Sequence, residues 1–111
     1  MSEAVTIKID EQQSRKIRLH VHKKGLSQAL YVGLLLTKYI YDEKIRAKCR
    51  RHLWINQYEL IGDGRHQMTL CINKMLREKA REVARDLGIK RTTLILKLIM
   101  MEMEGKVDFK I

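Results

Sequence analysis

The sequence predicts a mainly α-helical fold with a two-stranded antiparallel β-ribbon, in which one chain supplies both strands. Three observations predict it: the chain repeats itself, each copy passes from period-two to helical patterning, and glycines follow the expected helices. The chain also lacks proline, which suits helices joined by short connections. Its 111 residues suffice for one compact unit, or for two small ones that share a core.

The repeat is seen when the sequence is displaced by 63 residues against itself. Residues 4–36 then fall on residues 67–99 without a gap, with Thr6 on Thr69, and apolar positions of one copy meet apolar positions of the other. We therefore expect a first unit with an extended second helix, a linker, a second unit and a tail, at residues 1–54, 55–65, 66–105 and 106–111 respectively.

In the first copy, Val5–Ile9 alternates apolar and polar side chains, which is the pattern of a half-buried strand. Asp10 or Ser14 can cap the helix that follows. Gly25 is expected to end that helix, because a left-handed residue at this place costs least for glycine. Ser27 is then in position to cap the second helix of the unit.

The second copy follows the same plan more clearly. Met68–Ile72 alternates as a strand, and Lys74–Leu87 carries apolar side chains at helical spacing among charged ones. Gly88 is expected to end this helix. A further helix opens with Thr92 as its N-cap and ends before Gly105.

Two stretches are harder to assign. Ile17–Val21 alternates like a strand inside an expected helix, and the gapless register with the second copy favours the helix. After the first copy, the second helix continues or a further helix follows to about Trp54, because apolar side chains recur every fourth residue at Tyr41, Ile45, Cys49 and Leu53. Gly62–Gly64 is a loop, and Val107–Ile111 is either a short strand or a docked end.

A short strand, a helix closed by glycine and a second helix opened by Ser or Thr together resemble the ribbon-helix-helix family of Arc and MetJ type. Gly88–Ile95 is similar to that family's turn before its second helix, and Gly25–Ala29 matches it with the serine in place. The tandem single-chain form resembles regulators of archaeal viruses and plasmid transfer. The resemblance implies that Val5–Ile9 and Met68–Ile72 pair antiparallel as an intramolecular pseudo-dimer, since a lone strand leaves its backbone groups unpaired.

The composition is strongly basic, with a formal charge of +10 and a pI near 9.9. The excess is +3 in residues 1–30, +3 in 31–66 and +4 in 67–111. This even spread favours a folded basic surface over a basic tail, and nucleic acid over an anionic membrane as the partner. No apolar run reaches the roughly 18–20 residues that cross a bilayer, so we expect no membrane partner.

The resemblance implies that the ribbon enters the major groove of DNA, where each base pair presents a distinct donor and acceptor pattern. Lysine can donate to guanine, glutamine can pair with adenine, and threonine can hydrogen-bond or touch the thymine methyl group. The expected base contacts are the six outward side chains Ala4, Thr6, Lys8, Gln67, Thr69 and Cys71. Threonine also favours strands in general, so a solvated face without a DNA role is the alternative.

The starts of the two second helices are expected to hold the DNA backbone. A helix N-terminus presents free N–H groups and the positive end of the helix dipole, which together suit phosphate. The resemblance implies phosphate contacts by Ser27 and Gln28 in one copy, and by Lys90, Arg91 and Thr92 in the other. Ordinary capping by the serine and threonine is compatible with this role.

No recognisable catalytic or cofactor-binding motif is present, so we expect neither an enzyme nor a cofactor. Cys49 and His52 have zinc-like spacing, but no second ligand pair follows them, and we expect no metal site. Cys49 and Cys71 are expected to be packed free thiols in a reducing compartment. His20 and His22 point to different helix faces and are expected to be solvated.

These features predict a sequence-specific double-stranded DNA-binding transcription regulator, such as a repressor. The N-terminus lacks the charged-then-apolar order of a secretory signal, so we expect a cytoplasmic protein, in the host cytoplasm if viral. One alternative is a protein-interaction module of antitoxin or plasmid-transfer type, with a contact surface made by Trp54, Ile55, Tyr58, Leu60 and Ile61. The other is a non-specific nucleic-acid-coating protein. Further self-association of pseudo-dimers on DNA is left open.

Overall fold

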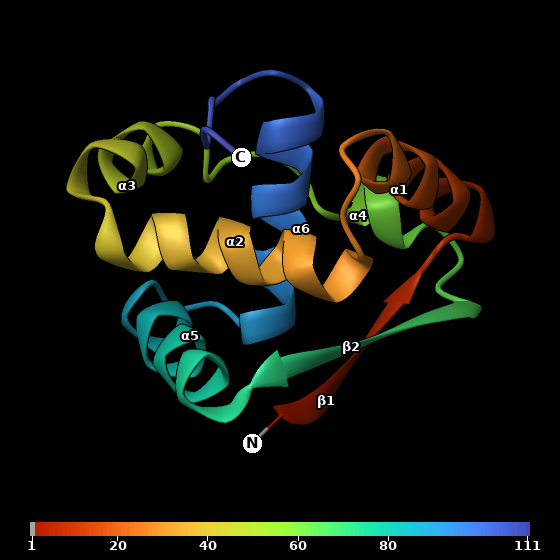
Figure 1. The fold of residues 1–111 in the computed structure, drawn as a ribbon, viewed down its shortest axis with the longest axis horizontal. Helices are drawn as coiled ribbons and strands as arrows, with labels where there is room; N and C mark the ends of the chain where they lie inside the picture. The colour runs from red at the N-terminus through yellow and green to blue at the C-terminus, as the bar shows by residue number, and fades with distance from the viewer. Residues whose placement is uncertain (1) are drawn as a thin grey trace.

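The computed structural model describes residues 2–111 as six helices and two strands (Figure 1). In chain order these are β1 (Ser2–Ile9), α1 (Glu11–Lys23), α2 (Gln28–Tyr41), α3 (Glu43–Arg50), α4 (Tyr58–Ile61), β2 (His66–Asn73), α5 (Lys74–Asp86) and α6 (Arg91–Met103). The expected mainly helical fold with a two-stranded antiparallel sheet is confirmed. Of the helices described, none has the length and apolarity needed to cross a membrane.

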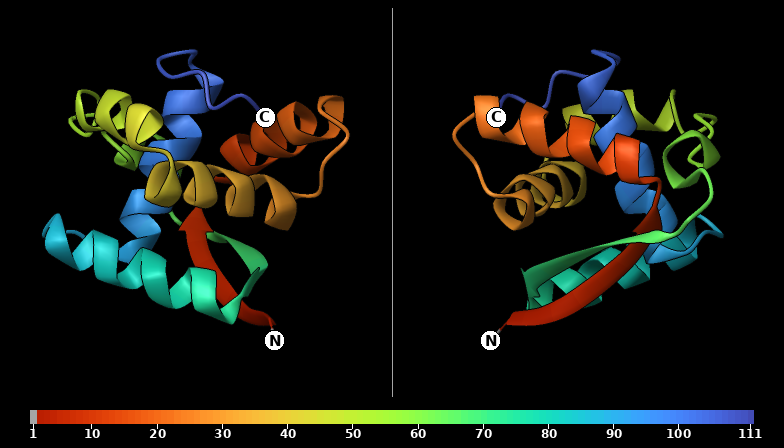
Figure 2. Two further views of the ribbon diagram at one scale, coloured as in Figure 1. Left: turned by 60° about the vertical axis from the view of Figure 1, so that its left-hand side comes forward. Right: turned by 90° about the vertical axis from the view of Figure 1, so that its right-hand side faces the viewer.

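The ribbon is formed by β1 and β2, which pair antiparallel with Thr6 opposite Thr69 near the middle of the ladder. Side chains alternate between its two faces. The inner face is apolar and at most 3% exposed, and consists of Val5, Ile7, Ile9, Met68, Leu70 and Ile72. Both views of Figure 2 show the ribbon at the periphery of the molecule, with the helices on one side of it.

The helices after each strand repeat at the spacing of the sequence repeat. α1 and α5 each span 13 residues, and α1 begins 63 residues before α5, as α2 begins 63 residues before α6. The turns between the paired helices contain Gly25 and Gly88, with φ angles of 71° and 74°. Because this left-handed region penalises residues with a Cβ, both turns require glycine in practice.

Helix α1 settles the ambiguous alternation in the first copy in favour of a helix. The Asp10 side chain caps it by accepting two backbone N–H groups of the first turn. Ile17 and Val21, one turn apart, are at most 2% exposed, whereas Leu19 is 61% exposed. The strand-like pattern therefore arose because Leu19 is an apolar residue on the solvated face of a helix.

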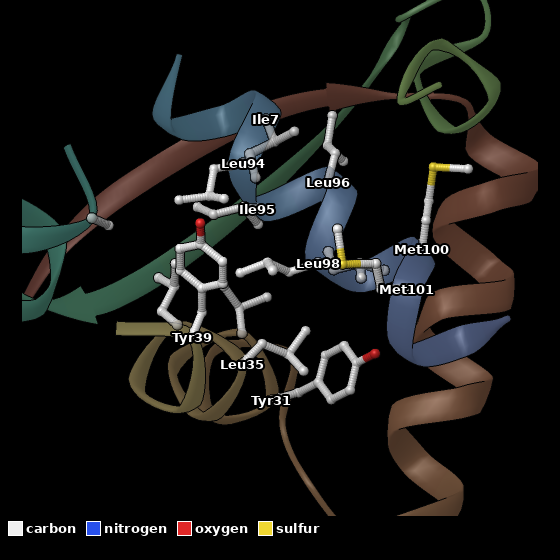
Figure 3. Close-up of a cluster of buried hydrophobic side chains, with 14 of the residues drawn as sticks. Ile7, Tyr31, Leu35, Tyr39, Leu94, Ile95, Leu96, Leu98, Met100 and Met101 are labelled. Carbon is white, nitrogen blue, oxygen red and sulfur yellow. The ribbon is translucent and has the colours of Figure 1, made fainter. Parts of the chain in front are cut away.

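The core lies between α2 and α6, which cross one another above the inner face of the ribbon (Figures 1 and 3). Figure 3 shows Leu35 and Tyr39 of α2 turned toward α6, from which Leu94, Ile95 and Leu98 reach back. All five side chains are at most 1% exposed. Because burial of apolar surface stabilises a fold by about 25 cal/mol per Å², this central cluster contributes strongly to stability.

Of the two alternatives for the middle segment, the structure shows a further helix and not a continuous one, because α2 ends at Tyr41 and α3 follows; the expected extension of the second helix to residue 54 is therefore absent. Asp42 is extended, with φ −109° and ψ 106°, and its carboxylate accepts the backbone N–H groups of Lys44 and Ile45 at the start of α3. Residues 55–65 are also more than a linker, since they contain the one-turn helix α4.

The middle segment and the tail both dock on the core. Ile55 and Leu60 are 3% and 6% exposed, and the ammonium group of Lys97 on α6 donates to the Ile55 carbonyl at 2.5 Å. Burial lowers the pKa of this lysine. Val107 and Phe109 are also buried without strand pairing, so the tail is a docked end.

Candidate nucleic-acid interface

The outer face of the ribbon carries all six side chains that the sequence placed there. Each of the six is exposed, and the ladder sets them directly opposite one another in three pairs. The pairs are Lys8 with Gln67, Thr6 with Thr69, and Ala4 with Cys71. Because side chains opposite one another in an antiparallel ladder lie roughly 5 Å apart, they form one contiguous strip.

Hydrogen-bonding capacity is graded along this strip. Lys8 and Gln67 form the end with charged and amide donors, and the two threonines occupy the centre. Ala4 and Cys71 form the other end, which offers a methyl group and a thiol. The two ends of the strip therefore differ in chemistry, although the strands pair one residue to one along the whole ladder.

The start of α2 is capped from within the protein. Ser27 is the N-cap, and its Oγ accepts the backbone N–H of Leu30 at 3.1 Å, so its predicted capping role is confirmed. Next to it, Nε2 of Gln28 is enclosed and has no hydrogen-bond partner among residues 2–111. The side-chain amide of Gln28 is thus a hydrogen-bond donor at this turn that the protein itself does not use.

The start of α6 is built differently. The helix begins at Arg91, so Lys90 is the N-cap and the prediction of Thr92 as N-cap is wrong. Thr92 lies in the first turn, and lysine has no acceptor with which to cap backbone N–H groups. The first turn of α6 consequently has no side-chain cap, and its N–H groups are available to an outside anion.

Arg91 lies half-buried in an electropositive place. Its Nε and Nη1 atoms are enclosed without a hydrogen-bond partner in the described part of the chain. Burial, and then the charges of Arg81 and Arg77, lower the pKa of its guanidinium group. The neighbouring carboxylates of Glu3 and Glu78 instead pair with Arg77. An anion at this surface would compensate a positive charge that the protein leaves largely uncompensated.

Sequence reasoning missed two arginines of this surface. Arg81 and Arg85 of α5 are exposed and line a hollow of about 380 Å³ with Lys90, Arg91 and Thr92. Their spacing of four residues on the helix that leads into the Gly88 turn is the signal that could have identified them.

A second hollow, of about 400 Å³, joins the start of α6 to the ribbon. It is lined by Thr6 and Lys8 from β1, by Ile61 from α4, and by Thr92 and Thr93 from α6. The donor-rich end of the outer face therefore lies beside the uncapped helix start. On the side of the second copy, the structure thus brings Thr6 and Lys8 of the predicted base contacts next to Thr92 of the predicted phosphate contacts.

The turn of the first copy is instead held by a carboxylate from α6. Glu102 accepts the hydroxyl of Tyr31 and Nε2 of His20, both at 2.5 Å, and lies 3.4 Å from Nζ of Lys24. Burial raises the pKa of Glu102, and the hydrogen bonds from Tyr31 and His20 lower it by more, so that it lies below its usual value. The expectation of a solvated His20 is therefore wrong, while His22 is exposed.

The two thiols are free and differ in accessibility. Cys49 is fully buried, and burial raises its pKa to about 12. Cys71 is exposed on the ribbon, so the expectation of a packed thiol is wrong for this residue. Within residues 2–111, no three or more His, Cys, Asp or Glu side chains gather in a geometry that could hold a metal ion.

Comparison with known proteins finds no family model, no curated protein and no solved structure that matches this chain.

Proposed function

We propose that this protein binds double-stranded DNA in a sequence-specific manner and acts as a transcription regulator, with the ribbon in the major groove. The observation that carries the proposal is the outer face of the ribbon, on which three opposed pairs of exposed, small or polar side chains form one strip. A two-stranded ribbon has the dimensions of the major groove, and such side chains can reach base edges without a large apolar surface to desolvate.

The register of the ladder supports a pseudo-dimer. Thr6 and Thr69, which are equivalent in the repeat, lie opposite each other, as residues on a two-fold axis must. Lys8 lies opposite Gln67, the equivalent of Ala4, and Ala4 lies opposite Cys71, the equivalent of Lys8. We therefore propose that the two strand–helix–helix units are related by an approximate two-fold axis through the threonine pair.

The basic surface at the start of α6 supports the backbone contacts. Arg81, Arg85, Lys90 and Arg91 share one hollow at an uncapped helix N-terminus. Phosphate contacts of this kind fix the register of a protein on DNA, while base edges give the specificity. In this proposal α6 makes the stronger backbone contact, and Ser27 and Gln28 at α2 make the weaker one.

The test is selection of bound sites from random-sequence DNA, followed by competition against bulk DNA over a range of salt concentrations. A specific regulator enriches a defined site and binds it at least about 1,000-fold more tightly than bulk DNA. Lys8→Ala should cost about 1–3 kcal/mol at particular base positions of the selected site. Arg91→Ala should weaken binding to all sequences alike and reduce the salt dependence by about one phosphate contact.

Two results would contradict the proposal. If no site is enriched and affinity depends on salt alone, the protein is a non-specific nucleic-acid coat. If Lys8→Ala and Arg91→Ala have the same effect on every sequence, the ribbon does not read bases.

A second candidate function is a protein-interaction module, and two exposed aromatic side chains favour it. Trp54 is 71% exposed and Tyr58 is 67% exposed, whereas Ile55 and Leu60 of the same segment are buried. Deletion of the segment would therefore damage the core, and the sharper test is the double variant Trp54→Ser and Tyr58→Ser. Unchanged DNA affinity together with loss of a bound partner protein would favour this function.

A further inference from the structure

A cavity of about 320 Å³ lies between α2, α3 and α5, outside the ribbon surface. Figure 1 shows α3 and the end of α5 on the side of the molecule away from α1. Part of the cavity wall is apolar and is formed by Ile40, Val83 and Leu87. Its volume lies at the lower end of the range of roughly 300–1,000 Å³ that is typical of small-molecule sites.

Positive charge dominates the polar part of the wall. Three cations, Arg46, Arg50 and Lys79, line the cavity with one carboxylate, Asp86. Arg46 is fixed by donation of Nη1 to the Ile40 carbonyl at 2.8 Å, and its Nη2 has a loose ion pair with Glu43 at 4.0 Å. Arg50 has no ion pair within the described residues, and the Lys79 ammonium group, about half exposed, has only a loose ion pair at 3.5 Å.

The cavity also contains a buried hydroxyl group whose proton has no acceptor. Tyr39 is 0% exposed, and its hydroxyl proton finds no acceptor among residues 2–111. Burial raises the pKa of this hydroxyl. The Arg50 guanidinium group, which is close enough to donate to the hydroxyl oxygen, and the charge of Arg46 lower this pKa by less. A buried hydroxyl that is left unpaired is rare in folded proteins and calls for an explanation.

The other half of the molecule shows how such a group is satisfied. Displaced by 63 residues, Tyr39 corresponds to Glu102, and Val83 and Leu87 correspond to His20 and Lys24. At the Glu102 position the protein supplies its own anion, which a tyrosine hydroxyl, a histidine and a lysine surround. At the Tyr39 position the protein supplies no anion. The Tyr39 hydroxyl instead lines the cavity with the three cations, which outnumber the single carboxylate, Asp86.

We propose that this cavity binds a phosphate monoester, with the phosphate held by Arg46, Arg50, Lys79 and the Tyr39 hydroxyl. A dianionic phosphate matches the excess of two positive charges better than a carboxylate does, and it offers acceptors to both arginines. The organic group of the ester would pack on the apolar wall. This site goes beyond DNA binding and does not depend on it.

The experiment is calorimetric titration of the full chain with phenyl phosphate and with inorganic phosphate, in a phosphate-free buffer. Phenyl phosphate should bind with one-to-one stoichiometry and more tightly than inorganic phosphate, because only the ester reaches the apolar wall. Arg50→Ala should weaken binding at least tenfold, and Tyr39→Phe should weaken it about fivefold, as expected for one lost hydrogen bond. Asp86→Asn should strengthen binding, since it removes the one opposing charge.

Arg51→Ala is the matched control, because Arg51 is exposed, adjacent in sequence, and outside the cavity wall. It should leave the affinity unchanged, although it removes the same charge as Arg50→Ala. Without ligand, Tyr39→Phe should melt at or above the wild-type temperature, so that its weaker binding is not a folding defect.

Equal losses in Arg50→Ala and Arg51→Ala would overturn the proposal, since they would indicate attraction by net charge alone. Absence of binding to both probes would overturn it as well. If an oligonucleotide lacking terminal phosphates displaces phenyl phosphate from the wild type, and Arg50→Ala also loses DNA affinity, the cavity is a DNA backbone contact and the assignment to a small ester is wrong.

Discussion

The two halves of the molecule follow one plan of elements but bury side chains of different size. On α1 the buried positions one turn apart are Ile17 and Val21, and at the matching positions of α5 they are Ala80 and Ala84. All four are at most 2% exposed. The comparison teaches that the repeat preserves which positions face the core, whereas the volume at each position is set by the neighbouring elements.

The turns differ in a second way. The first half closes its turn with Ser27 and with the carboxylate of Glu102, so that its polar groups are largely satisfied within the protein. The second half leaves the start of α6 without a side-chain cap and holds Arg91 among other arginines. We infer that the first half favours stability and that the second half retains an unsatisfied basic surface for an anionic partner.

The largest effect is expected where the two cores differ. Ile17→Ala makes α1 resemble α5 at one position, but the elements around α1 are packed for isoleucine, so a cavity should remain. We expect a loss of about 2–5 kcal/mol in the free energy of unfolding, measured by urea denaturation. Ala80→Ile is the reciprocal change and should cost about 1–3 kcal/mol by overpacking. A loss below about 1 kcal/mol for Ile17→Ala would show that the halves are packed interchangeably.

The next effect concerns the carboxylate that only the first half contains. Glu102→Gln should lower the free energy of unfolding by about 1.5–3 kcal/mol at pH 7, because it removes charge-assisted hydrogen bonds from Tyr31 and His20. The pKa of Glu102 lies below its usual value of 4.5 in the folded state. Its stabilisation is therefore fully present above pH 4.5 and is lost as the pH falls through that lowered pKa.

Urea denaturation of both proteins from pH 7 down to pH 3 is the measurement. The difference between wild type and Glu102→Gln should stay constant to about pH 5 and should then shrink. A difference that is unchanged at pH 3 would mean that Glu102 stabilises the turn by packing and not by its charge.

These contrasts also show how far the sequence alone could lead. The alternation in Val5–Ile9, the helical spacing after it and the glycines of both turns are local signals, and the repeat confirmed each by its counterpart. Together they were enough to predict the two strands, the helices that follow each strand and the six outward side chains, whereas the antiparallel pairing of the strands was implied by the family resemblance. Local patterns succeed here because every level of the signal agrees.

The failures have a common physical cause in contacts that are distant in sequence or in competing local signals. The contact between His20 and Glu102 joins residues 82 apart and leaves no local trace. Apolar residues recur every fourth position from Tyr41 to Leu53, on both sides of the break at Asp42. Because this pattern continues from α2 into α3, it gave no sign that α2 ends at Tyr41. At α6, Thr92 had the chemistry of a cap but lay two residues too late.

A smaller effect is expected when the two helix caps are compared directly. Ser27→Ala removes the acceptor for the Leu30 N–H and should cost about 1 kcal/mol of unfolding free energy. Lys90→Ala removes no cap and should change stability by less than about 0.5 kcal/mol. In DNA binding we expect the reverse order, with the larger loss for Lys90→Ala. Equal stability losses for the two variants would contradict the difference between the caps.

The smallest effect is expected at the poorer end of the ribbon. Cys71→Ser preserves size and should change affinity for the selected DNA site by less than about 0.5 kcal/mol, against about 1–3 kcal/mol for Lys8→Ala at the opposite end.

Cys71 should nevertheless lie at the interface, so iodoacetamide should modify it readily in the free protein and slowly in the complex. Cys49 is the internal control, because its buried thiol, with a pKa raised to about 12, should react only after unfolding. If DNA leaves the reaction of Cys71 unchanged, this end of the ribbon stays outside the groove. Equal losses for Cys71→Ser and Lys8→Ala would instead mean that the two ends read bases to the same extent, despite their unequal chemistry.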